Sequence, residues 1–287
     1  MTTSSQTAPR AACLIGWPVA HSRSPLIHKY WLSTLGIAGD YRIEPVRPED
    51  VAEFVMHLAA RGYVGCNVTI PHKERVLALT VPDERARSVG AANTLWFDDG
   101  VLRATNTDVE GFIGNLDASA PRWRQGGRAL VLGAGGSSRA VVFGLRERGA
   151  ERIYVANRTL SRAQELSDRF GGAVIALPWS AIGDVMAEVA LLVNTTSLGM
   201  QGQGALDIDL APLSAEAVVA DLVYAPLVTP LLAAARARGL ATADGLGMLL
   251  HQAVRGFSLW FGRTPQVTAE LRALVEADLL RPRERSS

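Results

Sequence analysis

The run Arg128-Ala-Leu-Val-Leu-Gly-Ala-Gly-Gly-Ser-Ser-Arg139 decides the fold class of this chain. Its apolar first part predicts a buried strand, and a helix is expected from Ala140 to Arg148. Glycines between a strand and a helix permit a tight turn and let backbone N–H groups approach a pyrophosphate at the positive end of the helix. Ser138 stands where the third glycine of G-x-G-x-x-G usually falls, and it is small enough for that place. The run predicts a dinucleotide-binding unit with contacts from Gly133, Ala134, Gly135, Gly136 and Ser137.

The segment after the next expected strand indicates which dinucleotide is bound. It is Asn157-Arg-Thr-Leu-Ser-Arg162, and it lacks the Asp or Glu that would accept from the ribose 2′-hydroxyl of NAD. Arg158 and Arg162 suit a 2′-phosphate instead, because each charge-assisted hydrogen bond contributes roughly 1.5–3 kcal/mol. Asn157 and Thr159 supply further donors. NADP is therefore predicted over NAD, and the alternative is that Arg162 is only a solvated helix charge.

Strands and helices alternate along most of the remaining chain, which predicts an α/β protein with parallel pairing. The turn Asp98-Asp99-Gly100 predicts a hairpin, and residues 117–127, with a proline and paired glycines, are expected to form a linker. The other expected strands are 11–15, 41–46, 63–69, 152–156, 173–178, 190–194 and 218–222, and the expected helices are 25–35, 48–60, 106–116, 229–238, 247–262 and 268–280.

These elements predict two domains, which a length of 287 residues can supply. Residues 1–107 are expected to form an α/β substrate-binding catalytic domain, and residues 108–243 a doubly wound Rossmann domain that binds NADP. Residues 244–287 contain helices with no strand of their own to cover, so we expect them to return to the substrate domain. Small ligands usually bind in clefts between domains.

The composition is that of a soluble globular protein, with 48% hydrophobic and 20% charged residues. A net charge of +1 gives no field that would recruit nucleic acid or an anionic membrane, so small molecules are the expected partners. Cys13 and Cys66 lie in apolar runs and are expected to be buried thiols, with one disulfide between them left open. The chain shows neither a membrane-length apolar run nor a signal peptide, which predicts a cytoplasmic location.

Lys73 is a catalytic candidate because lysine is rare in this chain. Only Lys29 and Lys73 occur among the 29 basic residues. Arginine stays protonated at any ordinary pH, whereas a lysine can give and take a proton. Lys73 lies in the run Asn67-Val-Thr-Ile-Pro-His-Lys73, while Lys29 has no comparable setting and is expected to be a surface charge.

A set of motifs, in unchanged order from about position 13 to 262, closely resembles those of the shikimate dehydrogenase family. The motifs cover nearly the whole chain, so the match is more specific than any one of them. They are residues 16–25, 67–73, Ala91-Ala-Asn-Thr94, Asn106-Thr-Asp108 with Gly111-Phe112, 133–139, 157–159, 194–200, 221–226 and 245–252.

The resemblance implies reversible reduction of 3-dehydroshikimate to shikimate with NADPH, in aromatic amino-acid biosynthesis. It implies that Lys73 and Asp108 are the catalytic pair, which handles the proton while the nicotinamide supplies a hydride. Substrate contacts are implied for Ser22, Ser24 and Tyr224 at the carboxylate and for Thr69, Lys73, Asn93, Asp108 and Gln252 at the ring oxygens, and further cofactor contacts for Leu222 and Gly245. A cleft rich in neutral hydroxyls and amides suits a polyhydroxylated ring.

Other interpretations remain open at this point. An NAD-dependent quinate/shikimate dehydrogenase is the nearest, and Arg158 and Arg162 argue against it. A non-catalytic sensor of the ring acid would not need Lys73 and Asp108, which are both present. The five histidines lack a metal-ligand spacing such as HExxH, and no G-x-S-x-G elbow occurs, so neither a metal site nor a serine hydrolase is expected. The protein is expected to be a monomer or a homodimer.

Three positions depart from the family pattern. Lys29 stands where an asparagine is more usual, Ala92 replaces a usual valine, and Ala104-Thr105 replaces a glycine-containing lead into Asn106. These departures bear on loop geometry and pocket volume. They leave Lys73 and Asp108 intact.

Overall fold

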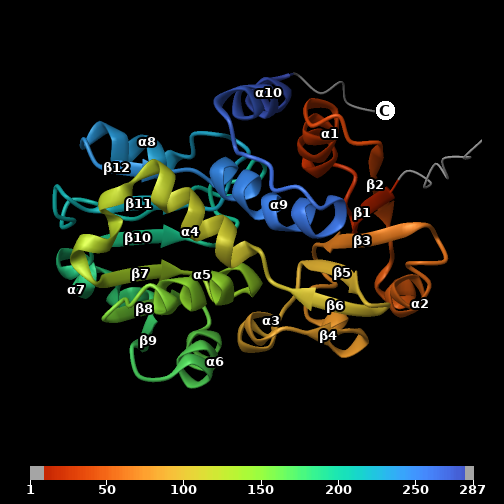
Figure 1. The fold of residues 1–287 in the computed structure, drawn as a ribbon. Helices are drawn as coiled ribbons and strands as arrows, with labels where there is room; N and C mark the ends of the chain where they lie inside the picture. The colour runs from red at the N-terminus through yellow and green to blue at the C-terminus, as the bar shows by residue number, and fades with distance from the viewer. Residues whose placement is uncertain (1–9, 282–287) are drawn as a thin grey trace, which may run out of the picture. The chain divides into compact units, whose positions relative to one another are not determined.

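The computed structural model describes residues 10–281, which divide into two compact units (Figure 1). The first unit contains the described residues up to Thr107 together with Ala253–Val267. The second contains Asp108–Gln252 and the described residues from Thr268 onward. In the described range, no helix has both the length and the apolar character needed to cross a membrane.

The first unit is built on a mixed sheet with the strand order β2-β1-β3-β5-β6-β4. β1 pairs in parallel with β2 and β3, whereas β5 is antiparallel to both β3 and β6. The hairpin expected at Asp98-Asp99-Gly100 is confirmed, since Asp99 (φ 48°) and Gly100 (φ 77°) both adopt positive φ between β5 and β6. The strands are β1 Arg10–Gly16, β2 Gly39–Pro45, β3 Tyr63–Val68, β4 Val81–Pro82, β5 Thr94–Asp98 and β6 Val101–Thr105.

The helices of this unit are α1 Ser24–Thr34, α2 Val51–Met56 and α3 Glu84–Val89, with 3-10 turns at Pro48–Asp50 and Arg75–Leu79. The helix expected over 48–60 is therefore too long. It ends at Met56 because Leu58 turns into the core, and the chain bends through hydrogen bonds from Arg61 to His57 and from Gly62 to Ala59. Gly62 closes the bend with φ 84°.

Alternate residues of β1, namely Ala11, Cys13 and Ile15, face the same side of the sheet and pack in one core cluster with residues of α2. Cys13 packs with Cys66 and the α2 side of the core. The two cysteines are register partners on β1 and β3, both are buried, and both are free thiols, so the disulfide that the sequence left open is absent here. Burial raises the pKa of the Cys13 thiol.

An aromatic cluster from α1, β2 and the end of α9 (Gly245–Phe261) forms another part of this unit. Its members are His28, Trp31, Tyr41, Phe257 and Trp260, and the His28 ring stacks on Tyr41 with centroids 4.1 Å apart. His28 is fully buried, and this burial lowers its pKa to about 3 because the charged ring is disfavoured in an apolar setting. The indole of Trp260 donates to the carbonyl of Leu95 (2.8 Å), which binds α9 to the sheet.

The second unit is a parallel sheet with the order β12-β11-β10-β7-β8-β9 (Figure 1). Every pairing in it is parallel. Counted from β7, this is the 3-2-1-4-5-6 order of the Rossmann fold, so the predicted fold class is confirmed. β12 was not expected from the sequence. The strands are β7 Arg128–Leu132, β8 Arg152–Asn157, β9 Val174–Pro178, β10 Leu191–Asn194, β11 Val218–Asp221 and β12 Ala241–Ala243.

Helices cover both faces of this sheet. Val131 of β7 packs on the face covered by α4 Asp108–Ser119, α5 Gly136–Glu147 and α6 Leu160–Phe170. Leu130 and Leu132 pack on the opposite face, which α7 Ile182–Val185 and α8 Pro230–Ala237 cover. The remaining helices are α9 Gly245–Phe261 and α10 Ala269–Leu280, with 3-10 turns at Pro121–Gly126, Trp179–Ala181 and Met186–Glu188.

Two expectations about connections differ from the structure. The linker expected at 117–127 is structured, because α4 continues to Ser119 and a 3-10 turn follows. Ala120 and Trp123 are buried in the core of the second unit, and the Trp123 indole donates to Asp117 Oδ1 (2.9 Å). The C-terminal helices also differ: α9 is shared between the units at Gln252, and α10 groups with the second unit instead of the first. The assignment of functional domains stays a prediction.

Candidate active site

Lys73 lies on the turn after β3, and the backbone of this turn is fixed at several points. The amide of Thr69 donates to the carbonyl of Ile15 (2.9 Å), and the amide of His72 donates to the carbonyl of Thr69 (3.0 Å). The carbonyl of Lys73 accepts from the amide of Ala92 (2.8 Å). The Lys73 side chain is half-buried. A fixed backbone under a partly exposed ammonium suits a group that must meet a ligand at a defined place.

His72 and Lys29 lie in settings that differ from that of Lys73. The His72 ring is buried and its Nε2 lies 2.7 Å from the carbonyl oxygen of Val46, so it joins the turn to the end of β2. Lys29 is exposed and forms an ion pair with Asp40 (3.3 Å). It is therefore a surface charge.

Asn93 is the centre of a buried polar network in the first unit. Its Oδ1 accepts from the amide of Thr107 (2.7 Å) and from the Thr107 hydroxyl (3.1 Å). Its backbone carbonyl accepts from the amide of Val68 (2.8 Å), and its amide donates to the carbonyl of Thr105 (3.1 Å). These bonds fix the orientation of Asn93 before any ligand binds.

Asn67 extends this network to β2. Its Nδ2 donates to the carbonyl of Asn93 and to Thr94 Oγ1 (both 3.1 Å). The Tyr41 hydroxyl donates to Asn67 Oδ1 (2.6 Å), and both side chains are buried. Asn67 thus braces the start of the segment that presents Lys73.

Ser22 and Ser24 lie together at the start of α1. The amide of Ser24 donates to Ser22 Oγ (3.2 Å), and the two hydroxyl oxygens are 3.1 Å apart. Helix α1 begins at Ser24, Arg23 occupies its N-cap position, and Ser22 Oγ accepts from the first amide of the helix. The paired hydroxyls can bind a carboxylate.

Asp108 and Gln252 are both buried in the second unit. Asp108 is the first residue of α4 and follows Thr107 directly in the chain. Gln252 lies on α9, where its Nε2 donates to the carbonyl of Leu249 (3.1 Å).

Tyr224 lies on the loop after β11, which a buried carboxylate braces. Asp221 accepts from Asn194 Nδ2 (2.9 Å), from the amide of Val223 (3.0 Å) and from the Thr229 hydroxyl (2.7 Å). Burial raises the pKa of Asp221, and these hydrogen bonds oppose that shift. Both ends of the Tyr224 loop are therefore fixed at one carboxylate.

The candidate substrate residues are divided between the two units. Ser22, Ser24, Thr69, Lys73 and Asn93 belong to the first unit, and Asp108, Tyr224 and Gln252 belong to the second. The structure joins Ser22 with Ser24 through hydrogen bonds. The pairing of Lys73 with Asp108 stays a prediction.

The glycine loop of the second unit fits a dinucleotide phosphate. Gly133 has φ 105°, and a Cβ there would lie 2.7 Å from Thr195 Oγ1, so only glycine fits. Gly135 and Gly136 are exposed, and a Cβ on either would meet none of the described residues within 4 Å. The backbone of Gly135 and Gly136 is therefore uncovered by other described residues at the N-terminus of α5, a position that favours an anion.

Ser138 does more than replace the third glycine. Its buried hydroxyl accepts from the amide of Gly135 (3.1 Å) and pairs with Thr195 Oγ1 (2.6 Å), which donates to the carbonyl of Leu132 (2.6 Å). This chain of hydrogen bonds holds the glycine loop to the segment after β10.

The segment expected to bind the 2′-phosphate is exposed. Arg158, Thr159 and Arg162 all face solvent, and Asn157 Nδ2 donates to the carbonyl of Thr159 (2.9 Å). The turn ends at Leu160, where α6 begins. Both arginines are accessible to a phosphate group, and the exposure of Arg162 is also what a solvated helix charge would show.

Leu222 and Gly245 lie against each other in this unit. The amide of Leu222 donates to the carbonyl of Asn194 (3.0 Å). A Cβ at Gly245 would lie 2.3 Å from the Leu222 carbonyl oxygen, so the start of α9 needs glycine here. This close approach fixes the positions of Leu222 and Gly245, the two residues that the resemblance implies as cofactor contacts.

Several supporting residues were not among the site residues predicted from the sequence. Tyr41 and Thr107 join the Asn93 network, and Thr195 and Asp221 brace the loops of the second unit. Their roles depend on neighbours far away in the chain. Among the described residues, no group of three or more His, Cys, Asp or Glu side chains could hold a metal ion.

Comparison with known proteins gives the family of this chain. Three family models match: the shikimate dehydrogenase substrate binding domain at residues 14–95, shikimate/quinate 5-dehydrogenase at 120–200, and the shikimate 5'-dehydrogenase C-terminal domain at 245–274. The NADP(+) shikimate dehydrogenase of Nitrobacter hamburgensis is 71% identical over 277 residues, which cover 96% of this chain and 97% of that protein. The chain belongs to the shikimate dehydrogenase family.

Solved structures of shikimate and quinate dehydrogenases share the fold. Shikimate 5-dehydrogenase from Thermus thermophilus, in complex with NADP(H) and shikimate, is 36% identical with a TM-score of 0.80 and covers 94% of this chain and 98% of its own. Quinate dehydrogenase from Corynebacterium glutamicum, in complex with NAD, is 33% identical with a TM-score of 0.88 and covers 94% and 99%.

Proposed function

We propose that this chain catalyses the reversible reduction of 3-dehydroshikimate to shikimate with NADPH, a step of aromatic amino-acid biosynthesis. The observation that carries the proposal is the 71% identity to an NADP(+) shikimate dehydrogenase over nearly the whole length of both chains. A solved relative binds both NADP(H) and shikimate. The predicted enzyme class and cofactor are confirmed at the level of the family.

In the proposed mechanism the protein handles one proton while the bound nicotinamide supplies a hydride to the ketone carbon. Lys73 donates a proton to the alkoxide as it forms and takes the proton back in the oxidation. Asp108 binds the same hydroxyl and shares the proton with Lys73. The fixed carbonyl of Lys73, which accepts from Ala92, supports this role because the ammonium then starts from a defined place.

The neutral polar residues are proposed to bind the substrate. Ser22 and Ser24 present paired hydroxyls to the carboxylate, and Tyr224 adds a third. Thr69, Asn93, Lys73, Asp108 and Gln252 are the proposed partners of the ring oxygens. A site built for a ring hydroxyl rejects an analogue that lacks it, because a buried polar group is then left unpaired.

The second unit is proposed to hold NADP through its glycine loop and the turn after β8. The proposed contacts of the glycine loop are Gly133, Ala134, Gly135, Gly136 and Ser137, which follow β7 and run into the first turn of α5. The other proposed contacts are Asn157, Arg158, Thr159 and Arg162 at the 2′-phosphate, with Leu222 and Gly245.

Initial rates test the proposal, measured separately with NADP⁺ and NAD⁺ on shikimate and on quinate. NADP⁺ with shikimate is expected to give the highest kcat/KM. Preference for NAD⁺ with quinate would support the quinate dehydrogenase interpretation, for which one solved relative is a precedent. Absence of turnover in all four combinations would support a sensor. A cytoplasmic location and a monomeric or homodimeric state stay predictions.

A further inference from the structure

Helices α4 and α9 approach each other unusually closely within the second unit, and glycines make this possible. A Cβ on Gly111 of α4 would lie 2.6 Å from Gln252 Cβ, 2.8 Å from the Met248 carbonyl oxygen and 3.0 Å from the Gln252 amide nitrogen. A Cβ on Gly247 of α9 would lie 1.8 Å from Asn115 Oδ1. Real Cβ atoms almost never approach so closely, so an added methyl group would force the helices apart.

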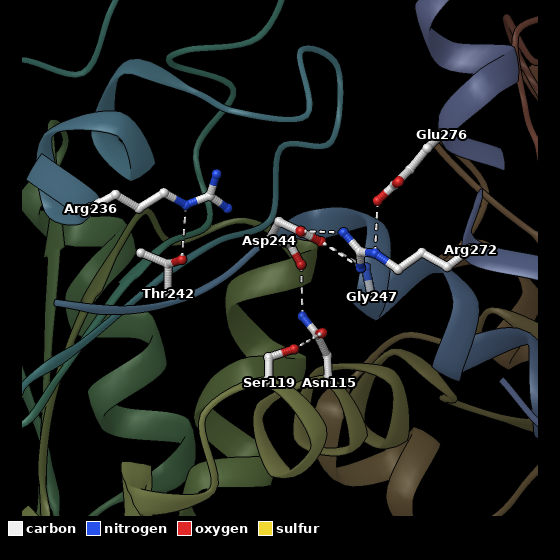
Figure 2. A network of polar contacts seen from close by, with 8 residues as sticks. All are labelled: Asn115, Ser119, Arg236, Thr242, Asp244, Gly247, Arg272 and Glu276. Carbon is white, nitrogen blue, oxygen red and sulfur yellow. Dashed lines mark hydrogen bonds and ion pairs between the residues drawn. The ribbon is translucent and has the colours of Figure 1, made fainter. Parts of the chain in front are cut away.

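A polar network fixes the start of α9 on α4 (Figure 2). Asn115 Nδ2 donates to the carbonyl of Asp244 (2.7 Å), and the Asp244 carboxylate accepts from the amide of Gly247 (3.1 Å). The Ser119 hydroxyl donates to Asn115 Oδ1 (3.1 Å). The spacing of the two helices is therefore set by hydrogen bonds as well as by packing.

Arg272 of α10 adds a third anchor to the same network. Its guanidinium binds the Asp244 carboxylate (2.6 Å) and also pairs with Glu276 (2.8 Å), as Figure 2 shows. Both ion pairs lie within the second unit. The Asp244 carboxylate is thus bound by the Gly247 amide of α9 and by the Arg272 guanidinium of α10.

This contact sets where two proposed substrate residues stand relative to each other. Asp108 is the first residue of α4, and Gly111 follows it by three positions, on the same helix face. The backbone of Gln252 lies directly over Gly111. We infer that Gly111 is a positioning residue, which lets Gln252 approach α4 and so fixes the distance between its amide and the Asp108 carboxylate. The inference rests on the proposed function, because it takes both residues as partners of the ring oxygens.

The expected size of the effect follows from the distances. Carbon atoms in ordinary contact are about 3.5–4.0 Å apart, so Gly111→Ala must move Gln252 by about 1 Å. A displacement of about 1 Å in a binding constellation costs up to roughly 10²-fold in rate. We expect kcat/KM for shikimate to fall about 10- to 100-fold in Gly111→Ala, while KM for NADP⁺ changes by less than about 3-fold.

Gly114→Ala is the matched control on the same helix. A Cβ on Gly114 would lie 3.1 Å from the His251 ring, which is a tight contact. The contact is with a side chain, which can rotate away, whereas a Cβ on Gly111 would meet backbone atoms of α9. It is expected to leave kcat/KM for shikimate within about 3-fold of the parent value. Equal losses in the two variants would overturn the inference, because they would show a general effect of adding bulk to α4.

A double-mutant cycle with Gln252→Ala tests whether Gly111 acts through Gln252. If it does, Gly111→Ala adds little to the loss already caused by Gln252→Ala, whereas full additivity would overturn the inference. Should Gly111→Ala fail to fold, Asn115→Ala decides, since it loosens the anchor without adding atoms. A rise in KM for shikimate alone supports the inference, and an unchanged KM overturns it. Absence of turnover by the parent protein would instead refute the proposed function before any variant is compared.

Discussion

The Asn93 network of the first unit and the segment proposed to bind the 2′-phosphate in the second unit place their polar groups in opposite ways. Around Asn93 in the first unit, amides and hydroxyls are uncharged, buried and bonded to one another. Arg158 and Arg162 in the second unit are charged and exposed. Each unpaired member of a buried network costs about 1–3 kcal/mol, so the first arrangement is set before a ligand binds. Exposed arginines instead acquire their geometry on binding, and salt screens their contribution.

Removal of Lys73, the charged group beside the buried network, is expected to have the largest effect. Lys73→Ala should lower kcat roughly 10²–10⁴-fold, the usual range for a positioned acid or base, with a much smaller change in KM for shikimate. Steady-state kinetics with saturating NADP⁺ measures both quantities. Lys29→Ala, at an exposed ion pair, is the control and should turn over normally. Near-normal turnover of Lys73→Ala would remove Lys73 from the chemistry.

Arg158→Ala tests the contribution of the exposed arginines to the binding of NADPH. Loss of one charge-assisted hydrogen bond of roughly 1.5–3 kcal/mol should raise the Kd for NADPH about 10- to 100-fold and leave the Kd for NADH almost unchanged. Because the site is exposed, the difference between parent and variant should shrink as salt is added. Fluorescence titration at two ionic strengths measures this, and equal losses with both cofactors would contradict the phosphate assignment.

Tyr41→Phe tests whether the buried network around Asn93 loses stability when one of its polar groups is left without a hydrogen bond. The variant removes the donor to Asn67 Oδ1 and leaves that oxygen buried, so the free energy of unfolding should fall by about 1–3 kcal/mol. Urea denaturation measures it. Tyr30→Phe, at a half-buried tyrosine of α1, is the control. A change below about 0.5 kcal/mol in Tyr41→Phe would show that the network tolerates an unpaired member.

The smallest expected effect is the dependence of stability on pH that comes from His28, whose ring is neutral because it is buried. Its pKa is lowered from 6.5 to about 3 by burial, so below pH 6.5 the unfolded chain binds a proton that the folded chain does not. Stability therefore falls as the pH falls, by about 1 kcal/mol between pH 6 and pH 5. This contribution should vanish in His28→Phe and persist in His57→Gln, an exposed control. Urea denaturation at the two pH values compares the slopes.

The second unit could be predicted from sequence more completely than the first. The run from Arg128 to Arg139 predicts a local strand-turn-helix unit. The strands and helices that alternate after it predict a parallel sheet of the Rossmann type. Short elements were missed: β12 is three residues long, and Ala120 and Trp123 pack in the core although their segment has the composition of a linker. Propensity alone does not show such tertiary contacts.

The supporting network of the first unit could not be predicted for a related reason. Asn67, Asn93 and Lys73 stand in recognisable motifs, but Tyr41 meets Asn67 only because β2 and β3 flank β1 in the sheet. Gly111 likewise stands in a motif, but its contact with Gln252 depends on how α9 crosses α4. The candidate residues were visible in the sequence, whereas the groups that hold them depend on strand order and helix crossing.

Deuterium transfer tests the central claim most directly. The protein is incubated with 3-dehydroshikimate and NADPH deuterated at both C4 positions of the nicotinamide, and the products are analysed by NMR. The proposed function predicts shikimate with deuterium on the new carbinol carbon, formed as NADPH is consumed. Binding of 3-dehydroshikimate without formation of labelled shikimate would contradict it.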